Sequence, residues 1–223
     1  CFEALGGNPL ILSQAIQAAR PAAGQTEEAA AILEELEGSS LFSAKVAIQD
    51  PLSLRCVAPI HGALLSALEG AEKAVEIELN SAADNPLVIL AEERVLSTGN
   101  FHTASLALAF ETLGLAIAQA ALASVARFVQ LTGSGRNGLP RYLSPAGGAS
   151  AGFVPMQKTV TAIAAQIRHK ANPVMLDAGV GGGRGSCDAV GACGAEMRRD
   201  ARPLAPVDRL RNAGGGARYR FAL

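Results

Sequence analysis

The residues best suited to chemistry form three polar clusters in a chain that is otherwise rich in alanine and leucine. The clusters are residues 49–55 (QDPLSLR), residues 78–86 (ELNSAADNP) and residues 99–102 (GNFH). Buried amides and charges need hydrogen-bond partners, so helical proteins rarely place such clusters near a core without a structural or functional reason. Each cluster is therefore a candidate binding site.

Arg55 and Gln49, in the first cluster, could together hold a small carboxylate ligand. A guanidinium can bind a carboxylate through two parallel hydrogen bonds, which fix its position as well as neutralise its charge. The side-chain amide of Gln49 can donate to the same ligand or accept from it. The alternative is structural, with Arg55 capping a helix or pairing with Asp50.

The other two clusters have both structural and functional interpretations. Asn80, Asp84 and Asn85 are expected to end a helix and tie the next loop to it, because such side chains bond readily to nearby backbone groups. Asn100 and Phe101 precede a predicted helix, whose exposed N–H groups make a mildly electropositive end. Phe101 could form the wall of a pocket for an aromatic ring, or it could be an ordinary core residue.

Long helices are predicted to position these clusters. Apolar residues recur at helical spacing from Pro59 to about Leu79, which predicts one long amphipathic helix. A second long helix is predicted at residues 103–131, where an alanine-rich face with Gly114 near its middle would let neighbouring backbones approach closely. The remaining predictions are shorter helices at about residues 10–20, 26–38 and 152–170, with Thr26 as an N-cap, an aperiodic connector at 41–56 and a short hairpin or extended excursion at 87–96. The expected fold is mainly α, a bundle of long helices.

The composition changes abruptly after Val180. Glycine, arginine and proline fill residues 181–223 without a period, and such a segment cannot bury enough apolar surface to offset its ordering entropy. We therefore predict a helical-bundle domain at residues 1–180 and an irregular tail at 181–223. A frameshift near Val180 is a hypothesis for this change, which resequencing would test.

Composition argues against several functional classes. The 19 basic and 20 acidic residues leave a net charge of −1, and two tyrosines without tryptophan offer little surface for base stacking, so nucleic acid is not an expected partner. The four cysteines form no CxxC pair and His61, His102 and His169 are scattered, so no metal site is predicted. Free thiols of this kind are typical of a cytoplasmic protein.

Residues 105–127 are long and apolar enough to raise the question of a membrane span. Glu111 and Gln119 interrupt the segment, and neither a positively charged loop nor an aromatic belt flanks it. We therefore predict a helix buried in a bundle and no membrane partner.

Taken in order, the motifs of this chain resemble those of the histidine and aromatic amino-acid ammonia-lyases. The resemblance covers residues 2–180 and runs through RPxxGQ (20–25), QDPLSLR (49–55), ExNSxxDNP (78–86), LSxGNFH (96–102), GLP (138–140) and SxGF (150–153). It implies a helical bundle like those of fumarase and aspartase. It also implies a homotetramer in which several subunits build each active site.

The family reaction removes ammonia from an α-amino acid without hydrolysis. The resemblance implies a methylidene-imidazolone electrophile, which such proteins make from Ala-Ser-Gly, and a base that takes a β-proton as the amine leaves. By similarity Arg55 would bind the substrate carboxylate, Gln49 would support the site, and Phe101 with Asn100 would line it. Leu52 stands where many members have a tyrosine that shapes the site.

The chain departs from the family pattern in a second respect. The 223 residues contain no Ala-Ser-Gly tripeptide. We therefore expect the chain to be a C-terminal portion of such a lyase, which makes no cofactor of its own and is inactive alone. Asp188 could stand in for an acidic motif of the family. Two alternatives are a helical assembly module that complements a chain carrying the N-terminal half, and part of an aminomutase, which uses the same electrophile.

Overall fold

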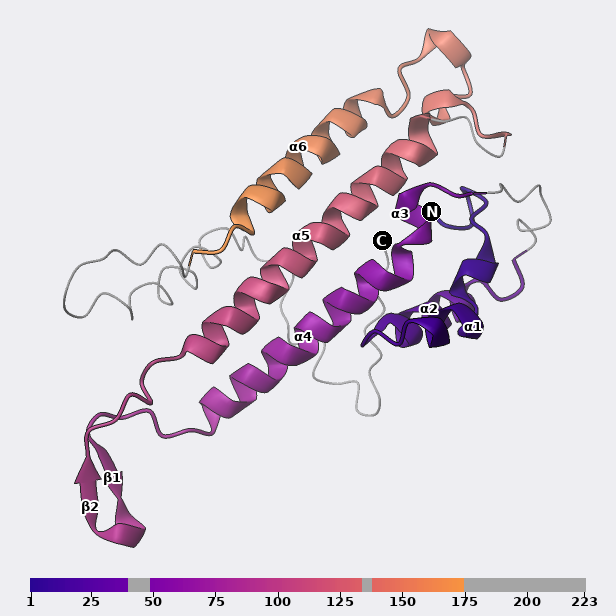
Figure 1. Ribbon diagram of the computed structural model, residues 1–223. Coiled ribbons are helices and arrows are strands. Elements are labelled where there is room, and N and C mark those ends of the chain that lie inside the picture. The colour runs from indigo at the N-terminus through magenta and orange to yellow at the C-terminus, as the bar shows by residue number, and fades with distance from the viewer. Residues whose placement is uncertain (40–48, 134–137, 175–223) are drawn as a thin grey trace. The chain divides into compact units, whose positions relative to one another are not determined.

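The computed structural model describes residues 1–39, 49–133 and 138–174. The chain is mainly helical, which confirms the predicted fold class. It divides into two compact units (Figure 1): one consists of Cys1–Ala82 and Ala104–Pro173, and the other contains Ala83–Thr103. The predicted tail and its boundary at residue 180 lie outside the described residues.

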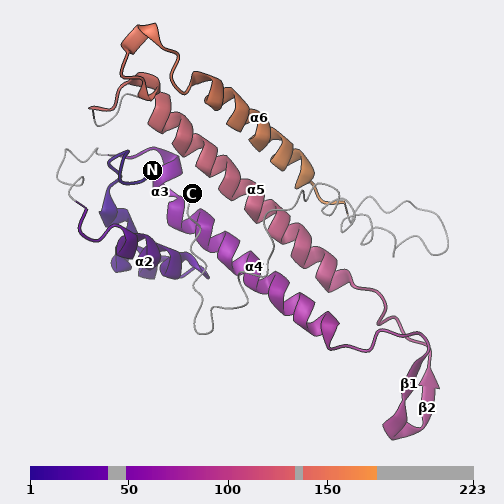
Figure 2. The same ribbon diagram turned by 180° about the vertical axis from the view of Figure 1, so that it is seen from behind.

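Three long helices dominate the first unit. They are α4 (Val57–Leu79), α5 (Ala104–Gly133) and α6 (Val154–Lys170), each within two residues of the predicted bounds. In both views of the ribbon α5 lies between α4 and α6 (Figures 1 and 2). Small side chains on all three helices are buried, among them Ala71, Ala118, Ala123 and Ala164. Between α5 and α6 the chain forms two 3-10 turns, η5 (Arg141–Leu143) and η6 (Gly147–Ala149).

The N-terminal segment packs against the start of α4. It comprises η1 (Pro9–Leu12), α1 (Gln14–Ala19) and α2 (Gln25–Glu35). A hydrophobic cluster forms there around Leu5, Leu12 and Leu54, whose exposed fractions are 0%, 2% and 0%. Leu54 belongs to α3 (Leu52–Arg55), so the core holds the segment that carries the first polar cluster.

Helix α3 corrects the prediction of an aperiodic connector at residues 41–56. Pro51 precedes the helix, and the main-chain N–H groups of Leu54 and Arg55 donate to its carbonyl, at 2.9 and 3.1 Å. A single turn is too short to produce a periodic apolar pattern, and burial of Leu54 in the core stabilises it instead.

The prediction of Thr26 as the N-cap of α2 is wrong. Gly24 occupies this position, in the left-handed conformation with φ of 74°. Its backbone lies directly against Gly62 of α4, where an added Cβ would stand 2.6 Å from the Cα and N atoms of Gln25. The close backbone approach therefore occurs at Gly62, whereas a Cβ on Gly114 would meet no atom within 4 Å in the part of the chain that is described.

Arg20 and Gln25 of the RPxxGQ motif form a chain of hydrogen-bonded side chains with Gln17 beside this contact. Arg20 Nη1 donates to Gln25 Oε1 at 2.8 Å, and Gln25 Nε2 donates to Gln17 Oε1 at 2.7 Å. Gln17 Nε2 in turn donates to the carbonyl of Ile11 at 3.0 Å. With Gln17 and Gln25 only 2% and 4% exposed, these bonds satisfy amides that burial would otherwise penalise.

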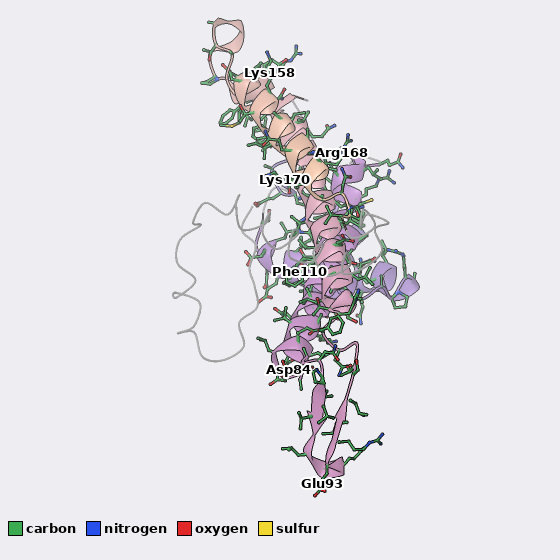
Figure 3. The ribbon with its side chains drawn as sticks, turned by 90° about the vertical axis from the view of Figure 1, so that its left-hand side faces the viewer. Asp84, Glu93, Phe110, Lys158, Arg168 and Lys170 are labelled. Carbon is green, nitrogen blue, oxygen red and sulfur yellow. The ribbon has the colours of Figure 1, made fainter. Side chains whose placement is uncertain are left out.

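The second unit contains the predicted hairpin. Strands β1 (Leu87–Ile89) and β2 (Arg94–Leu96) pair antiparallel around η3 (Leu90–Glu92), with Glu93 at the tip (Figure 3). Asn85 closes the base of the hairpin, since its Oδ1 accepts from Ser97 Oγ at 3.1 Å and from the backbone N of Thr98 at 2.9 Å. Asn85 thus has a structural role of the kind predicted for its cluster.

Helix α6 carries basic side chains, whereas α5 is mainly apolar. Figure 3 shows Lys158, Arg168 and Lys170 along α6, and the last two lie in its final turn, where the helix dipole favours positive charge. Helix α5 is long and apolar enough to cross a membrane by length and composition, yet only 17% of its most apolar window is buried within this chain. The single chain therefore does not supply the burial that the sequence predicted for this helix.

Candidate substrate-binding site

Hydrogen bonds hold the segment that carries the first polar cluster near both of its ends. Asp50 is 5% exposed, and its Oδ2 accepts from the backbone N of Asn8 at 2.7 Å. Arg55 Nε donates to the carbonyl of Asp50 at 2.9 Å, so the predicted structural pairing of these two residues exists through the main chain. Arg55 is exposed and makes no other hydrogen bond within the described residues, which leaves its two terminal nitrogens able to bind a carboxylate.

The turn separates residues that serve the core from residues that face solvent. Leu54 points into the core, whereas Leu52 is 66% exposed and Gln49 and Arg55 are exposed as well. Leu52 and Arg55 are therefore exposed on one helical turn, and the exposed Gln49 lies three residues before it.

The third cluster belongs to the second unit. Phe101 is 47% exposed, so its alternative assignment as a core residue is wrong within the described chain. Asn100 is exposed, and its backbone N donates to Thr98 Oγ1 at 2.8 Å. Because the two units are described separately, the prediction that Phe101 and Arg55 share a cavity stays a prediction. Asp188 lies outside the described residues.

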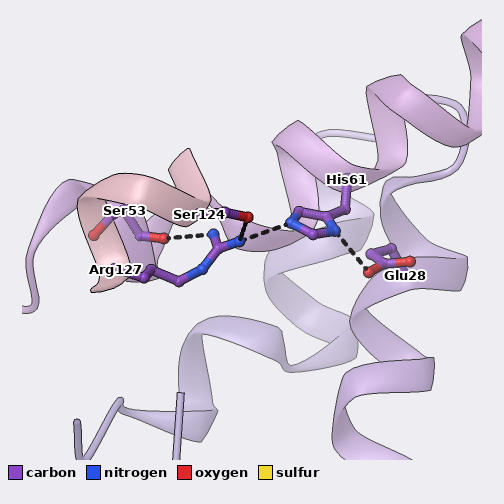
Figure 4. Close-up of polar contacts among 5 residues, drawn as sticks. All are labelled: Glu28, Ser53, His61, Ser124 and Arg127. Carbon is purple, nitrogen blue, oxygen red and sulfur yellow. Dashed lines mark hydrogen bonds and ion pairs between the residues drawn. The ribbon is translucent and has the colours of Figure 1, made fainter. Parts of the chain in front are cut away.

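Behind the turn lies a polar network that the sequence did not reveal (Figure 4). Arg127 of α5 is 6% exposed, and its Nη1 donates to the carbonyl of Ser53 in α3 at 3.2 Å. Its Nη2 donates to Ser124 Oγ at 2.9 Å and lies 3.1 Å from His61 Nε2 of α4. His61 Nδ1 is 3.5 Å from Glu28 Oε1 of α2, so the network connects four helices.

The chemistry of arginine determines the protonation of His61. A guanidinium has donors only, so the His61 Nε2 that faces Arg127 must be an acceptor, and the ring proton resides on Nδ1, toward Glu28. Burial, together with the charge of Arg127, lowers the pKa of His61, which agrees with a neutral ring. Burial also raises the pKa of Glu28 and lowers the pKa of Arg127.

One sequence signal for this network does exist. Arg127 is the one basic residue of a mainly apolar helix rich in alanine and leucine, and a buried arginine requires acceptors. Its partners could not be inferred, because Ser53 and His61 are 74 and 66 residues away along the chain.

Two grooves open beside α4 and α5. One, of about 470 Å³, is lined mainly by small side chains: Ala23, Ala63, Ser66, Ala67, Gly70, Ala109 and Thr112. The other, of about 410 Å³, is more apolar, with Leu68, Val75, Leu79, Phe110 and Leu113 in its lining. Neither is lined by Arg55 or Gln49.

The first unit is a bundle of long helices in which the turn that bears Arg55 precedes α4, and this fold is shared with solved structures of ammonia-lyases and aminomutases. Residues 1–181 match the family model described as aromatic amino acid lyase. The histidine ammonia-lyase of Treponema denticola is 38% identical over 178 residues, which cover 79% of this chain and 35% of that protein. The chain therefore belongs to the aromatic amino acid lyase family, and it spans about a third of the length of the curated relatives it matches.

Solved structures agree with this assignment. The ergothioneine-degrading enzyme ergothionase from Treponema denticola is 28% identical with a TM-score of 0.76, over 88% of this chain and 42% of that chain. Phenylalanine aminomutase from Pantoea agglomerans has the same TM-score of 0.76 at 24% identity, over 88% of this chain and 44% of that chain. At that lower identity the likeness shows the fold alone.

Proposed function

We propose that this chain supplies the carboxylate-binding part of an amino-acid ammonia-lyase, which eliminates ammonia from histidine or an aromatic amino acid. The observation that carries the proposal is that Arg55 is exposed on the α3 turn and that its two terminal nitrogens bond to no group among the described residues. Gln49 and Leu52 are exposed near Arg55 in the sequence and would contact the rest of the substrate. Phe101 and Asn100 would line the same site.

The methylidene-imidazolone group of the family does not fit this chain by itself. Its precursor is Ala-Ser-Gly, and the tripeptide is absent from the 223 residues. The proposed role of the chain is therefore binding and orientation, and the chain alone is inactive. Incubation with histidine, phenylalanine or tyrosine should yield no ultraviolet-absorbing acrylate, and clear turnover would contradict the proposal.

The partner that completes the site would bind the apolar surface of α5. Large side chains on this helix are exposed in the single chain: Leu108, Leu115, Ile117, Leu122 and Val129. Exposed apolar surface of this extent is typical of an interface. The partner is either further copies, as in a homotetramer, or a chain that carries Ala-Ser-Gly. The second possibility makes this chain an assembly module, and co-purification with such a chain would support it.

The role of Arg55 is best tested in the assembled lyase, with the Ala-Ser-Gly-bearing part on the same or a second chain. Loss of a charge-assisted pair of hydrogen bonds should raise KM about 10- to 100-fold in Arg55→Gln, with a smaller rise in Arg55→Lys. Arg94→Gln is the matched control, because Arg94 is an exposed arginine of the hairpin, paired with Glu92. An unchanged KM in both Arg55 variants would refute the assignment.

A further inference from the structure

In the single-turn helix α3, the carbonyl of Ser53 accepts no hydrogen bond from α4 within the described residues. The last carbonyls of any helix lack donors within that helix, and basic side chains often supply them. Here the carbonyl of Ser53 receives its donor from Arg127, which reaches it from α5. Ser53 precedes Arg55 by two residues, so the position of its carbonyl constrains the residue that faces the substrate.

The Arg127 guanidinium is itself held from several sides. Ser124, one turn earlier on α5, accepts from Nη2, and His61 Nε2 accepts from the same nitrogen. Glu28 stands behind His61 and keeps its proton on the far side of the ring. Because Arg127 is only 6% exposed, its charge is retained at a desolvation cost that these contacts offset.

We propose that Arg127 is a positioning residue: through the carbonyl of Ser53 it sets the place of the Leu52–Arg55 turn and thereby the direction of the Arg55 guanidinium. His61 and Glu28 hold Arg127 in the orientation that this requires. The inference rests on the proposed role of Arg55 in carboxylate binding, but the mechanical link between Arg127 and the turn can be measured separately.

Lysine cannot replace Arg127 in this role. Its ammonium keeps the charge, but it is a point donor and lacks the planar fork that contacts Ser53 and His61 from two different nitrogens. Arg127→Lys thus separates the geometry of the contact from its charge, and Arg127→Met removes both.

Amide hydrogen exchange on the full 223-residue chain tests the link directly. The amides of Leu54, Arg55 and Cys56 are bonded within the turn. In Arg127→Lys they should exchange at least about tenfold faster, while amides of α6 change less than about twofold. Arg94→Lys, at an exposed arginine, should leave both sets unchanged. Unchanged exchange in the turn, or an equal rise in α6, would overturn the proposal.

A milder variant covers the case in which both Arg127 variants fail to fold. Ser124→Ala places a good helix former in α5 and removes one of the groups that hold Arg127. The same three amides should exchange about two- to tenfold faster, the factor for one ordinary hydrogen bond. If they do not, Arg127 does not control the turn.

A double-mutant cycle in the assembled lyase tests whether Arg127 acts through Arg55. Arg127→Lys should raise KM in the wild-type background but add little to Arg55→Lys, because the group it positions is already altered. Multiplicative effects would show an independent structural role and overturn the proposal. If Arg55→Lys itself has no effect, the proposed function fails, while the exchange result still decides whether Arg127 holds the turn.

Discussion

Substitution of Gly62 by alanine tests how the N-terminal segment docks on α4. A Cβ at this position would stand 2.6 Å from the Cα and N atoms of Gln25 and 2.7 Å from the carbonyl carbon of Gly24. These are backbone atoms, so no side-chain rotation can relieve the overlap, and the start of α2 must move away from α4. Overpacking of this kind costs about 1–3 kcal/mol.

Gly70→Ala on the same helix is the matched control. A Cβ on Gly70 meets nothing within 4 Å among the described residues, so this variant should gain about 0.5–1 kcal/mol from the higher helix propensity of alanine. The same gain applies to Gly62→Ala. The difference between the two variants therefore isolates the overpacking cost, which we expect in the upper half of the range.

The assay is urea unfolding followed by circular dichroism at fixed protein concentration, because association of the chains would shift the apparent stability. Gly62→Ala should unfold at a clearly lower urea midpoint than Gly70→Ala, with a Tm roughly 4–12 °C lower in a thermal scan. Equal stability of the two alanine variants would refute the argument that the Gly24–Gly62 contact requires glycine on α4.

Four further predictions concern polar groups. Burial lowers the pKa of His61 from 6.5. The contribution of His61 to the free energy of unfolding is therefore full above about pH 6.5 and falls as the pH decreases toward the lowered pKa. The urea midpoints measured near pH 7.5 and 5.5 should differ more for the wild type than for His61→Asn. The raised pKa of Glu28 has the opposite sign, with its contribution lost as the pH rises from 4.5 through the raised value, and Glu28→Gln should remove this component from a stability-against-pH curve. Gln25→Ala should cost about 1–3 kcal/mol in urea unfolding, because it leaves buried partners unpaired, whereas Gln119→Ala on the exposed side of α5 should change stability by less than about 0.5 kcal/mol. Asn85→Ala should speed amide exchange in the hairpin but leave the global urea midpoint within error, and a large shift in that midpoint would contradict a local role.

The long helices were predictable because their signals are local. Apolar spacing located α4 and α5 to within two residues, and turn residues located the hairpin at 87–96. The motifs also identified the family, whose model matches residues 1–181. Within the candidate site, the sequence placed Gln49, Leu52 and Arg55 in one cluster; the structure puts Leu52 and Arg55 in α3 and Gln49 just before it, and their role in binding stays a prediction.

The errors occurred where long-range contacts determine local structure. Thr26 followed by two glutamates matches a common N-cap pattern, yet α2 begins beside Gly24 because this is where the backbone meets Gly62 of α4. Helix α3 was missed for a similar reason, since burial of Leu54 and not periodicity stabilises it.

The sequence by itself determined the helical class, the positions of the long helices and the family, and it predicts an arginine suited to a carboxylate. Only the tertiary structure showed that Arg127, His61 and Glu28 meet behind the turn that carries this arginine. The physical reason is that periodicity and capping depend on residues a few positions apart. The partner of a buried charge depends on which helices pack together, and residues that are distant in the chain become neighbours only in the folded bundle.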